Sequence, residues 1–188
     1  MSCEFCASTT GGLVRSMTVG EMLEEVMAVS RDVGERIGNV VLMGTGEPFD
    51  NYDQVMKFIK TINHPKGLNI GQRHMTLSTS GIVPRIYDFA EEKLQCTLAI
   101  SLHGADDETR SKLMPVNRKY NLEKLMDACR YYIRATNKRV TFEYALIKDV
   151  NDSVKDAHKL GTLLKGMLCH VNLIPVNKVE GKDFLKAS

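Results

Sequence analysis

Two cysteines stand at the start of the chain, at a spacing found in metal, cluster and redox sites. Cys3 and Cys6 form a CxxC pair, whereas Cys96, Cys129 and Cys169 are single and widely spaced. Zinc and iron–sulfur sites use about three or four thiolate ligands. A thiol redox pair begins a helix after a strand, and no strand precedes Cys3. Cys3 and Cys6 are therefore either a redox or coincidental pair, or part of a larger cysteine set whose remaining member lies upstream of the chain.

Small and polar residues also follow the apolar runs that read as strands. These groups are Gly44–Pro48, Ser78–Gly81, Ser101–Gly104 and Pro175–Asn177. Functional residues at the carboxyl ends of successive strands are typical of a β/α barrel. A doubly wound dinucleotide fold instead concentrates its glycines in one turn, and Gly44 and Gly46 lack the third glycine of that turn. The pattern favours a barrel.

The elements that position these residues alternate regularly along the chain. The apolar runs predict strands at Val40–Met43, His74–Ser78, Thr97–Leu102, Val140–Ile147 and His170–Val176. Helix-period stripes lie between the strands, with starts near Thr18, Asn51, Pro84, Asn121 and Asp152. This order predicts parallel strands joined by right-handed crossovers. The expected fold is α/β, a partial barrel of about five parallel strands with outer helices and with the first barrel strand missing.

Composition narrows the class of protein without identifying it. The chain has 188 residues, of which 43% are hydrophobic and 26% charged, as in ordinary globular domains. No apolar stretch approaches the roughly 18 residues of a membrane span, and no signal peptide is visible. Five cysteines without disulfide-framework spacing suit a reducing compartment. We expect a cytoplasmic location, and a net charge of +2 is too small to indicate nucleic-acid binding by itself.

Several longer segments resemble the bacterial dual-specificity RNA methyltransferases, which are radical S-adenosylmethionine (SAM) enzymes. The segments are Phe5–Ser8, Gly11–Leu13, Met43–Tyr52, Thr76–Ile82, Ser101–His103, Arg110–Pro115 and Val171–Asn177. The cluster motif of that family is CxxxCxxC, and this chain would hold its second and third cysteines. The resemblance implies that residues 1–188 are a radical SAM core domain truncated at both ends. An N-terminal helical domain and a C-terminal loop with a methyl-carrier cysteine would lie outside it.

The resemblance also implies the cofactors and the residues that bind them. A 4Fe–4S cluster would be bound by Cys3 and Cys6, and SAM would be bound by Gly46, Glu47, Ser78, Ser101, Leu102, His103 and Asn177. Residue chemistry suggests individual roles. Glu47 suits the SAM ammonium, and Gly46 allows a close backbone approach. The methyl-carrier and resolving cysteines would lie outside the chain. We expect these 188 residues alone to bind no stable cluster and to be inactive.

The implied reaction is methylation of carbon 2 of adenine in 23S rRNA and tRNA, by way of a 5′-deoxyadenosyl radical and a methyl-cysteine. A reductase or a flavodoxin-type protein would donate electrons, and no membrane is involved. The alternatives are a carbon-8 rRNA methyltransferase that confers antibiotic resistance, a glycyl-radical-enzyme activase and an inactive α/β scaffold. The basic group from Arg110 to Lys119 predicts either an RNA-facing rim or an ordinary solvated loop.

Overall fold

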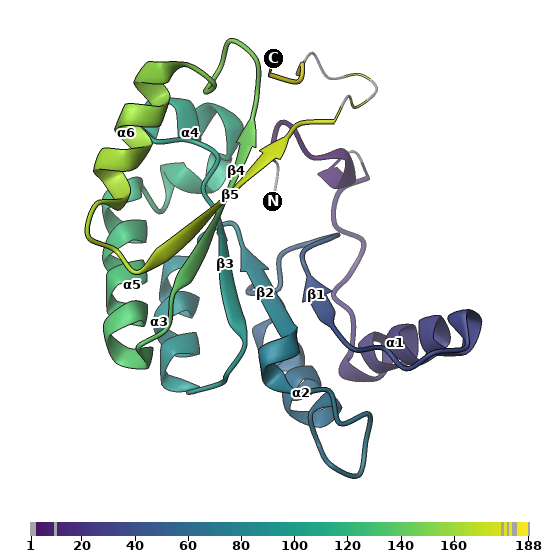
Figure 1. The fold of residues 1–188 in the computed structure, drawn as a ribbon. Helices are drawn as coiled ribbons and strands as arrows, with labels where there is room; N and C mark the ends of the chain where they lie inside the picture. The colour runs from purple at the N-terminus through teal and green to yellow at the C-terminus, as the bar shows by residue number, and fades with distance from the viewer. Residues whose placement is uncertain (1–2, 10, 178, 180, 182–183, 188) are drawn as a thin grey trace.

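A single parallel sheet forms the centre of the molecule (Figure 1). The computed structural model describes residues 3–9, 11–177, 179, 181 and 184–187. In this part of the chain the sheet has five strands in the order β1-β2-β3-β4-β5. They are β1 (Val40–Leu42), β2 (Met75–Thr79), β3 (Thr97–Ser101), β4 (Val140–Leu146) and β5 (Cys169–Pro175). The predicted parallel arrangement is confirmed, and each predicted strand end lies within about one residue of the observed one.

Helix α1 precedes β1, and the other helices form the crossovers between successive strands. They are α1 (Val19–Val33), α2 (Tyr52–Ile62), α3 (Val83–Glu91), α4 (Asp107–Leu113), α5 (Leu122–Thr136) and α6 (Val154–Leu164), with short 3-10 turns η1 (Ala7–Thr9), η2 (Gln72–His74) and η3 (Pro115–Arg118). The helix start predicted near Thr18 is confirmed, and a capping box forms there through reciprocal bonds between Thr18 and Glu21. None of the described helices is long and apolar enough to cross a membrane.

Helix α4 was not predicted from the sequence. Its seven residues carry no apolar stripe, and only its cap indicates it. The side chain of Asp106 accepts a hydrogen bond from the Thr109 amide at 2.8 Å, and two acidic residues follow in the first turn. Acidic groups stabilise the positive end of a helix. This helix matters for function because it carries Arg110 to the carboxyl end of the sheet.

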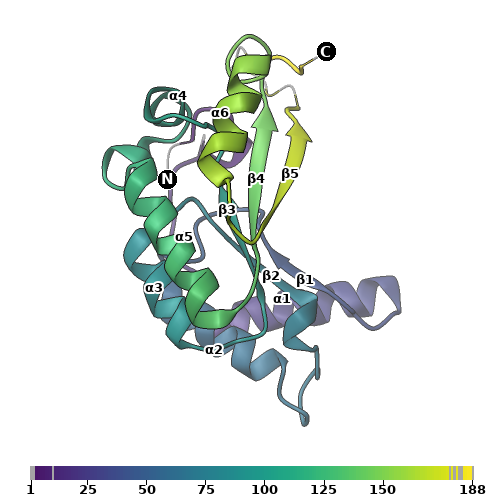
Figure 2. The ribbon, with the colours of Figure 1, turned by 60° about the vertical axis from the view of Figure 1, so that its left-hand side comes forward.

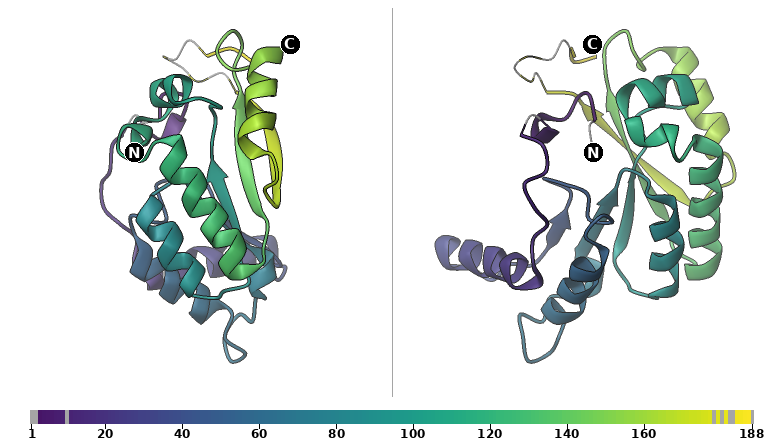
Figure 3. Two further views of the ribbon diagram at one scale, coloured as in Figure 1. Left: turned by 90° about the vertical axis from the view of Figure 1, so that its left-hand side faces the viewer. Right: turned by 180° about the vertical axis from the view of Figure 1, so that it is seen from behind.

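The two faces of the sheet have different environments. Alternate residues such as Met75, Leu98 and Phe142 point outward and are fully buried in the main core. Helices α3, α5 and α6 run along this outer side of the sheet (Figures 2 and 3). The residues between them point to the inner, concave face, where Val41 keeps 58% of its surface exposed. The apolar core therefore lies between sheet and helices, and the inner face remains available for polar groups.

A second, smaller core closes the carboxyl end of the inner face. It contains Leu113, Met114, Ala145, Ile147 and Val176, and Cys3 and Phe5 pack against it. The amide of Glu4 donates a hydrogen bond to the carbonyl of Leu113 at 2.9 Å. The N-terminal cysteine segment thus crosses the carboxyl ends of the strands, at the same end of the molecule as the C-terminus (Figure 1).

Candidate cofactor site at the carboxyl end of the sheet

The sequence-predicted polar residues come together at one edge of the sheet. Ser78 lies one residue before the end of β2, and Ser101 is the last residue of β3. Glu47 lies in the loop after β1, His103 follows β3, and Asn177 follows β5. Because all strands are parallel, these five positions share the carboxyl edge.

Glu47 connects two strand ends through its carboxylate. Oε2 accepts hydrogen bonds from the amide and the hydroxyl of Ser80, both at 2.7 Å, and Oε1 accepts one from the Phe49 amide at 3.0 Å. A carboxylate offers about four acceptor positions, so one remains for a ligand. The preceding Gly46 has φ of +88°, which glycine adopts without strain. Sequence reasoning selected Ser78 and missed Ser80 as the partner of Glu47.

The side chain of Arg110 links the carboxyl ends of β2 and β3. Its side chain is fully buried, and it donates to the carbonyls of Ser80 at 2.6 Å, Ser101 at 3.2 Å and Leu102 at 3.2 Å. It also donates to the side chain of Asn117 at 2.8 Å. Burial lowers the pKa of Arg110 to about 10, so the guanidinium stays charged at neutral pH. The prediction that Arg110 belongs to an RNA-facing rim is wrong, because this buried side chain cannot reach phosphate.

Leu102 and His103, which follow Ser101 at the end of β3, are both buried. The side chain of Leu102 lies in the main core, and its amide donates to the Glu143 carbonyl at 2.9 Å. Nδ1 of His103 accepts a hydrogen bond from the Ala145 amide at 2.9 Å, which places the ring proton of the neutral form on Nε2. Burial, with a smaller effect of Arg110, lowers the pKa of His103 to about 3. Both residues thus have contacts within the protein, and the expectation that they bind SAM stays a prediction.

The imidazole of His103 also supports the cysteine segment. Its ring lies 4.7 Å from that of Phe5, centroid to centroid, in an edge-to-face arrangement. Phe5 lies between Cys3 and Cys6 in the chain, so this contact fixes the segment over the strand ends. His103 has φ of +53°, a conformation in which its ring reaches both Phe5 and β4.

The inner face carries polar side chains that run across four neighbouring strands. Strand register pairs Ser101 with Glu143 and Glu143 with Asn172. Ser80 and Ser101 each lie one residue beyond the paired Thr79 and Ile100. We call Ser80, Ser101, Glu143 and Asn172 the polar row. Sequence reasoning missed Glu143, although a lone carboxylate inside the apolar run Val140–Ile147 was a usable signal.

Cys3 and Cys6 lie in one tight turn above this face. The Cys6 amide donates to the Cys3 carbonyl at 3.2 Å, and both side chains are half-buried. Burial, and then the neighbouring Cys6, raises the pKa of the Cys3 thiol. The described residues contain no group of three or more histidine, cysteine, aspartate or glutamate side chains placed to hold a metal. Cys3 and Cys6 therefore supply two of the three thiolates that a 4Fe–4S cluster of the CxxxCxxC type needs. The third ligand is not among the described residues.

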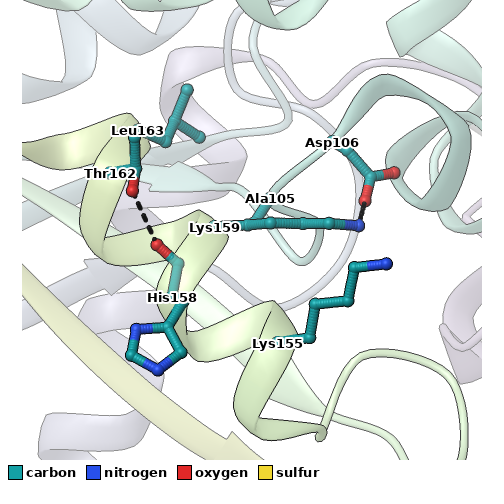
Figure 4. A pocket seen from close by; sticks show the side chains of 7 residues that line it. All are labelled: Ala105, Asp106, Lys155, His158, Lys159, Thr162 and Leu163. Carbon is teal, nitrogen blue, oxygen red and sulfur yellow. Dashed lines mark hydrogen bonds and ion pairs between the residues drawn. The ribbon is translucent and has the colours of Figure 1, made fainter.

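Two hollows of the described surface lie away from these residues. One, of about 540 Å³, lies between the β3–α4 loop and α6, where Lys159 forms an ion pair with Asp106 (Figure 4). Another, of about 410 Å³, lies between α6 and the outer side of β4 and β5. Neither hollow is lined by Glu47, Ser78, Ser101, His103 or Asn177.

Comparison with known proteins agrees with this geometry. Residues 1–161 match the sequence profile of the Radical SAM superfamily. A "Probable dual-specificity RNA methyltransferase RlmN" from Clostridium acetobutylicum is 60% identical over 186 residues, which are 99% of this chain and 54% of that protein. The protein of the same name from Caldanaerobacter subterraneus subsp. tengcongensis is 61% identical over 188 residues, 100% of this chain and 55% of that protein. The chain thus spans about half the length of the curated relatives it matches.

Solved structures show the same fold. A radical SAM methyltransferase from Sphaerobacter thermophilus superposes with a TM-score of 0.96 at 46% identity, covering 100% of this chain and 56% of that one. Streptococcus suis SuiB bound to S-adenosylmethionine superposes with a TM-score of 0.68 at 16% identity, covering 100% of this chain and 40% of that one, a likeness of fold alone. Since the family profile covers most of the chain and the cysteine turn lies over the strand ends, this chain belongs to the radical SAM superfamily.

Proposed function

We propose that this chain is the core domain of a dual-specificity RNA methyltransferase that methylates carbon 2 of adenine in 23S rRNA and tRNA. The observation that carries the proposal is the convergence of Glu47, Ser78 and Ser101 at one edge, beneath a turn that holds Cys3 and Cys6. About 60% identity to relatives named for this activity supports the choice of reaction.

The implied cofactors suit the residues at this edge. When bound, a 4Fe–4S cluster supplies the electron that cleaves the sulfonium of SAM. Cys3 and Cys6 would hold two irons, and the free acceptor position of Glu47 would take the SAM ammonium. No described residue bonds the hydroxyls of Ser78 and Ser101, so both can bind a ligand. Asn177 exposes its amide after β5, where it can read an adenine edge.

The remaining residues would orient this site. Arg110 fixes the strand ends that carry Ser80 and Ser101, and Gly46 keeps the approach to Glu47 clear of side chains. Phe5 and His103 hold the cysteine turn against the inner face. The methyl-carrier and resolving cysteines would come from outside residues 1–188. Cys96 and Cys129 are not placed for either of these two roles, because both side chains are buried in the main core.

The RNA would approach across the exposed carboxyl edge. Arg118 and Lys119 are exposed there, at the end of η3, and can meet phosphate in place of Arg110. An N-terminal helical domain outside this chain would contribute further RNA contacts. We also propose a cytoplasmic location and a reductase or flavodoxin-type electron donor, as the reaction requires reducing equivalents.

The test compares cells with and without the gene that encodes this chain in its full-length form. Nucleosides from 23S rRNA and tRNA are separated and identified by mass spectrometry. The proposal predicts that 2-methyladenosine disappears on deletion and returns with a plasmid copy, while a copy with Cys3→Ala and Cys6→Ala does not restore it. Loss of 8-methyladenosine instead would assign the carbon-8 reaction, and unchanged nucleosides would contradict an RNA methyltransferase.

A further inference from the structure

Glu143 is a buried carboxylate that neither the proposed chemistry nor the packing of the core uses. It lies in the middle of β4 on the inner face and keeps 5% of its surface exposed. The side-chain amide of Asn172 donates to its Oε2 atom at 2.8 Å. No described lysine or arginine forms an ion pair with it. A carboxylate this deep requires donors, because its desolvation is costly when they are missing.

The second oxygen of Glu143 is open to a ligand. No described residue donates a hydrogen bond to Oε1. In the described part of the chain, the hydroxyl of Tyr52 is the only fully enclosed side-chain polar atom without a partner. Oε1 of Glu143 is therefore unpartnered but not enclosed, and it opens onto the concave face. Asn172 holds the carboxylate in one orientation, which prepares it for directional binding.

The position of Glu143 relative to the cysteine turn identifies the part of the ligand it meets. Ala145, the next inner-facing residue of β4, packs in the small core that Cys3 and Phe5 cover. Glu143 is the inner-facing residue of β4 just before Ala145, so it lies farther from the carboxyl end of the strand on the same face. In the polar row, Glu143 on β4 is two strands away from Ser80, which follows β2 and binds Glu47. Two strand spacings separate Glu143 from Ser80 by about 10 Å. A ligand with its amino group at Glu47 and its sulfur under the cysteine turn would extend its nucleoside over Ser101 and Glu143.

We propose that Glu143, oriented by Asn172, binds the ribose hydroxyls of SAM. The inference rests on the proposed function, since it takes SAM as the ligand of this edge. A vicinal diol presents two neighbouring donors, and a carboxylate accepts them in the way that an acidic residue accepts a ribose hydroxyl in dinucleotide folds. Ser101, paired with Glu143 in the register, supplies a hydroxyl beside the same ring. Glu143 is then a binding residue, and Asn172 positions it.

The experiment measures SAM affinity of the cluster-loaded full-length protein by anaerobic calorimetry. Four proteins are compared: wild type, Glu143→Gln, Asn172→Ala and the matched control Glu123→Gln, whose carboxylate is exposed on α5. Each is titrated with SAM and with SAM analogues that lack the 2′ or the 3′ hydroxyl. Thermal unfolding verifies that every variant is folded.

The proposal predicts that Glu143→Gln weakens SAM binding about ten- to hundredfold, as expected for a hydrogen bond to a charged group. Loss of the contacted hydroxyl weakens binding to the wild type by a similar factor and has little further effect on the variant. Asn172→Ala gives a smaller loss, and Glu123→Gln gives none. If the wild type binds both deoxy analogues as tightly as SAM, the proposal is overturned even where a variant fails to fold.

The outcomes distinguish the ribose contact of Glu143 from the proposed function of the chain. Wild-type binding with Glu143→Gln unchanged would overturn the ribose contact and leave the proposed function intact. Additive losses from the variant and the analogues would show that Glu143 meets another donor, such as the adenine amino group, and would also overturn it. Absence of SAM binding by the loaded wild type would contradict the proposed function itself.

Discussion

The Nη2 atom of Arg110 lies 2.6 Å from the carbonyl oxygen of Ser80, and both residues are buried. The same nitrogen lies 3.2 Å from the carbonyl of Ser101. One guanidinium therefore fixes the ends of two adjacent strands that carry the candidate site. It does so without a carboxylate partner, through carbonyls and the side chain of Asn117. The site depends on α4 as much as on the sheet.

Replacement of Arg110 should destabilise the protein strongly. Arg110→Met removes four hydrogen bonds that one buried guanidinium donates, three of them to main-chain carbonyls, and each such bond contributes about 1–3 kcal/mol. We expect a loss of about 3 kcal/mol or more in the free energy of unfolding, measured by urea titration, and a partial recovery in Arg110→Lys. The exposed Arg130→Met, on the outer side of α5, is the control. A loss for Arg110→Met no larger than for the control would contradict this role.

Glu47 and Ser80 should behave as a coupled pair. A double-mutant cycle with Glu47→Gln and Ser80→Ala is expected to give a coupling energy of about 1–2 kcal/mol, because the hydrogen bonds involve a charged, half-buried carboxylate. The ion pair of Lys112 and Glu108 is solvent-exposed, and its cycle should give a clearly smaller coupling energy. Equal coupling in the two cycles would show that Glu47 does not connect β1 to β2.

Stability should fall in acid through His103. The unfolded imidazole has a pKa near its ordinary 6.5, whereas burial lowers the pKa to about 3 in the fold. Between these values the unfolded chain binds more protons, so stability rises with pH up to about 6.5 and is flat above it for this group. In His103→Asn an amide oxygen can replace Nδ1 as acceptor, and asparagine tolerates the positive φ of this position.

The measurement is the melting temperature between about pH 4.5 and 7.5, where His103 changes its protonation on unfolding. Carboxylates titrate in both proteins, so the difference between wild type and His103→Asn isolates the imidazole. We expect a shallower acid decline in the variant. Parallel curves would mean that His103 is not held neutral by burial.

Gly104 should not tolerate a side chain. A Cβ atom there would lie 2.8 Å from the amide nitrogen of Arg110 and 2.9 Å from its Cα. Gly104→Ala must displace the middle of α4, at Arg110, at a cost of about 1–3 kcal/mol. Gly44→Ala is the matched control, because a Cβ at Gly44 meets nothing within 4 Å. Chemical denaturation of the two variants checks this, and equal stabilities would contradict the close contact of loop and helix.

The strands could be predicted well from the sequence, because the spacing of apolar residues reflects which side chains are buried. It also predicted that Glu47, Ser101 and Asn177 follow strand ends, since parallel strands place those ends at one edge. The roles of these residues in binding stay predictions. Arg110 was misread because arginine is mostly exposed, and nothing local shows that three carbonyls surround it.

The directions of side chains at the strand ends could not be predicted from the sequence. Two serines, Ser78 and Ser80, both point to the inner face, and only the tertiary contact with Glu47 shows which one it binds. Leu102 and His103 follow Ser101 directly, yet one turns into the core and the other turns under Phe5. These outcomes depend on backbone angles after the strand, which sequence periodicity does not specify.

A crystal structure of the cluster-loaded protein with SAM is the most direct test of the proposed binding site. We expect the SAM amino group to lie within hydrogen-bond distance of Glu47 and the sulfur to lie beneath the turn of Cys3 and Cys6. The adenosine should cover Ser101 and Glu143 on the inner face. SAM bound in the hollow between α6 and the β3–α4 loop, or on the outer side of β4 and β5, would contradict it.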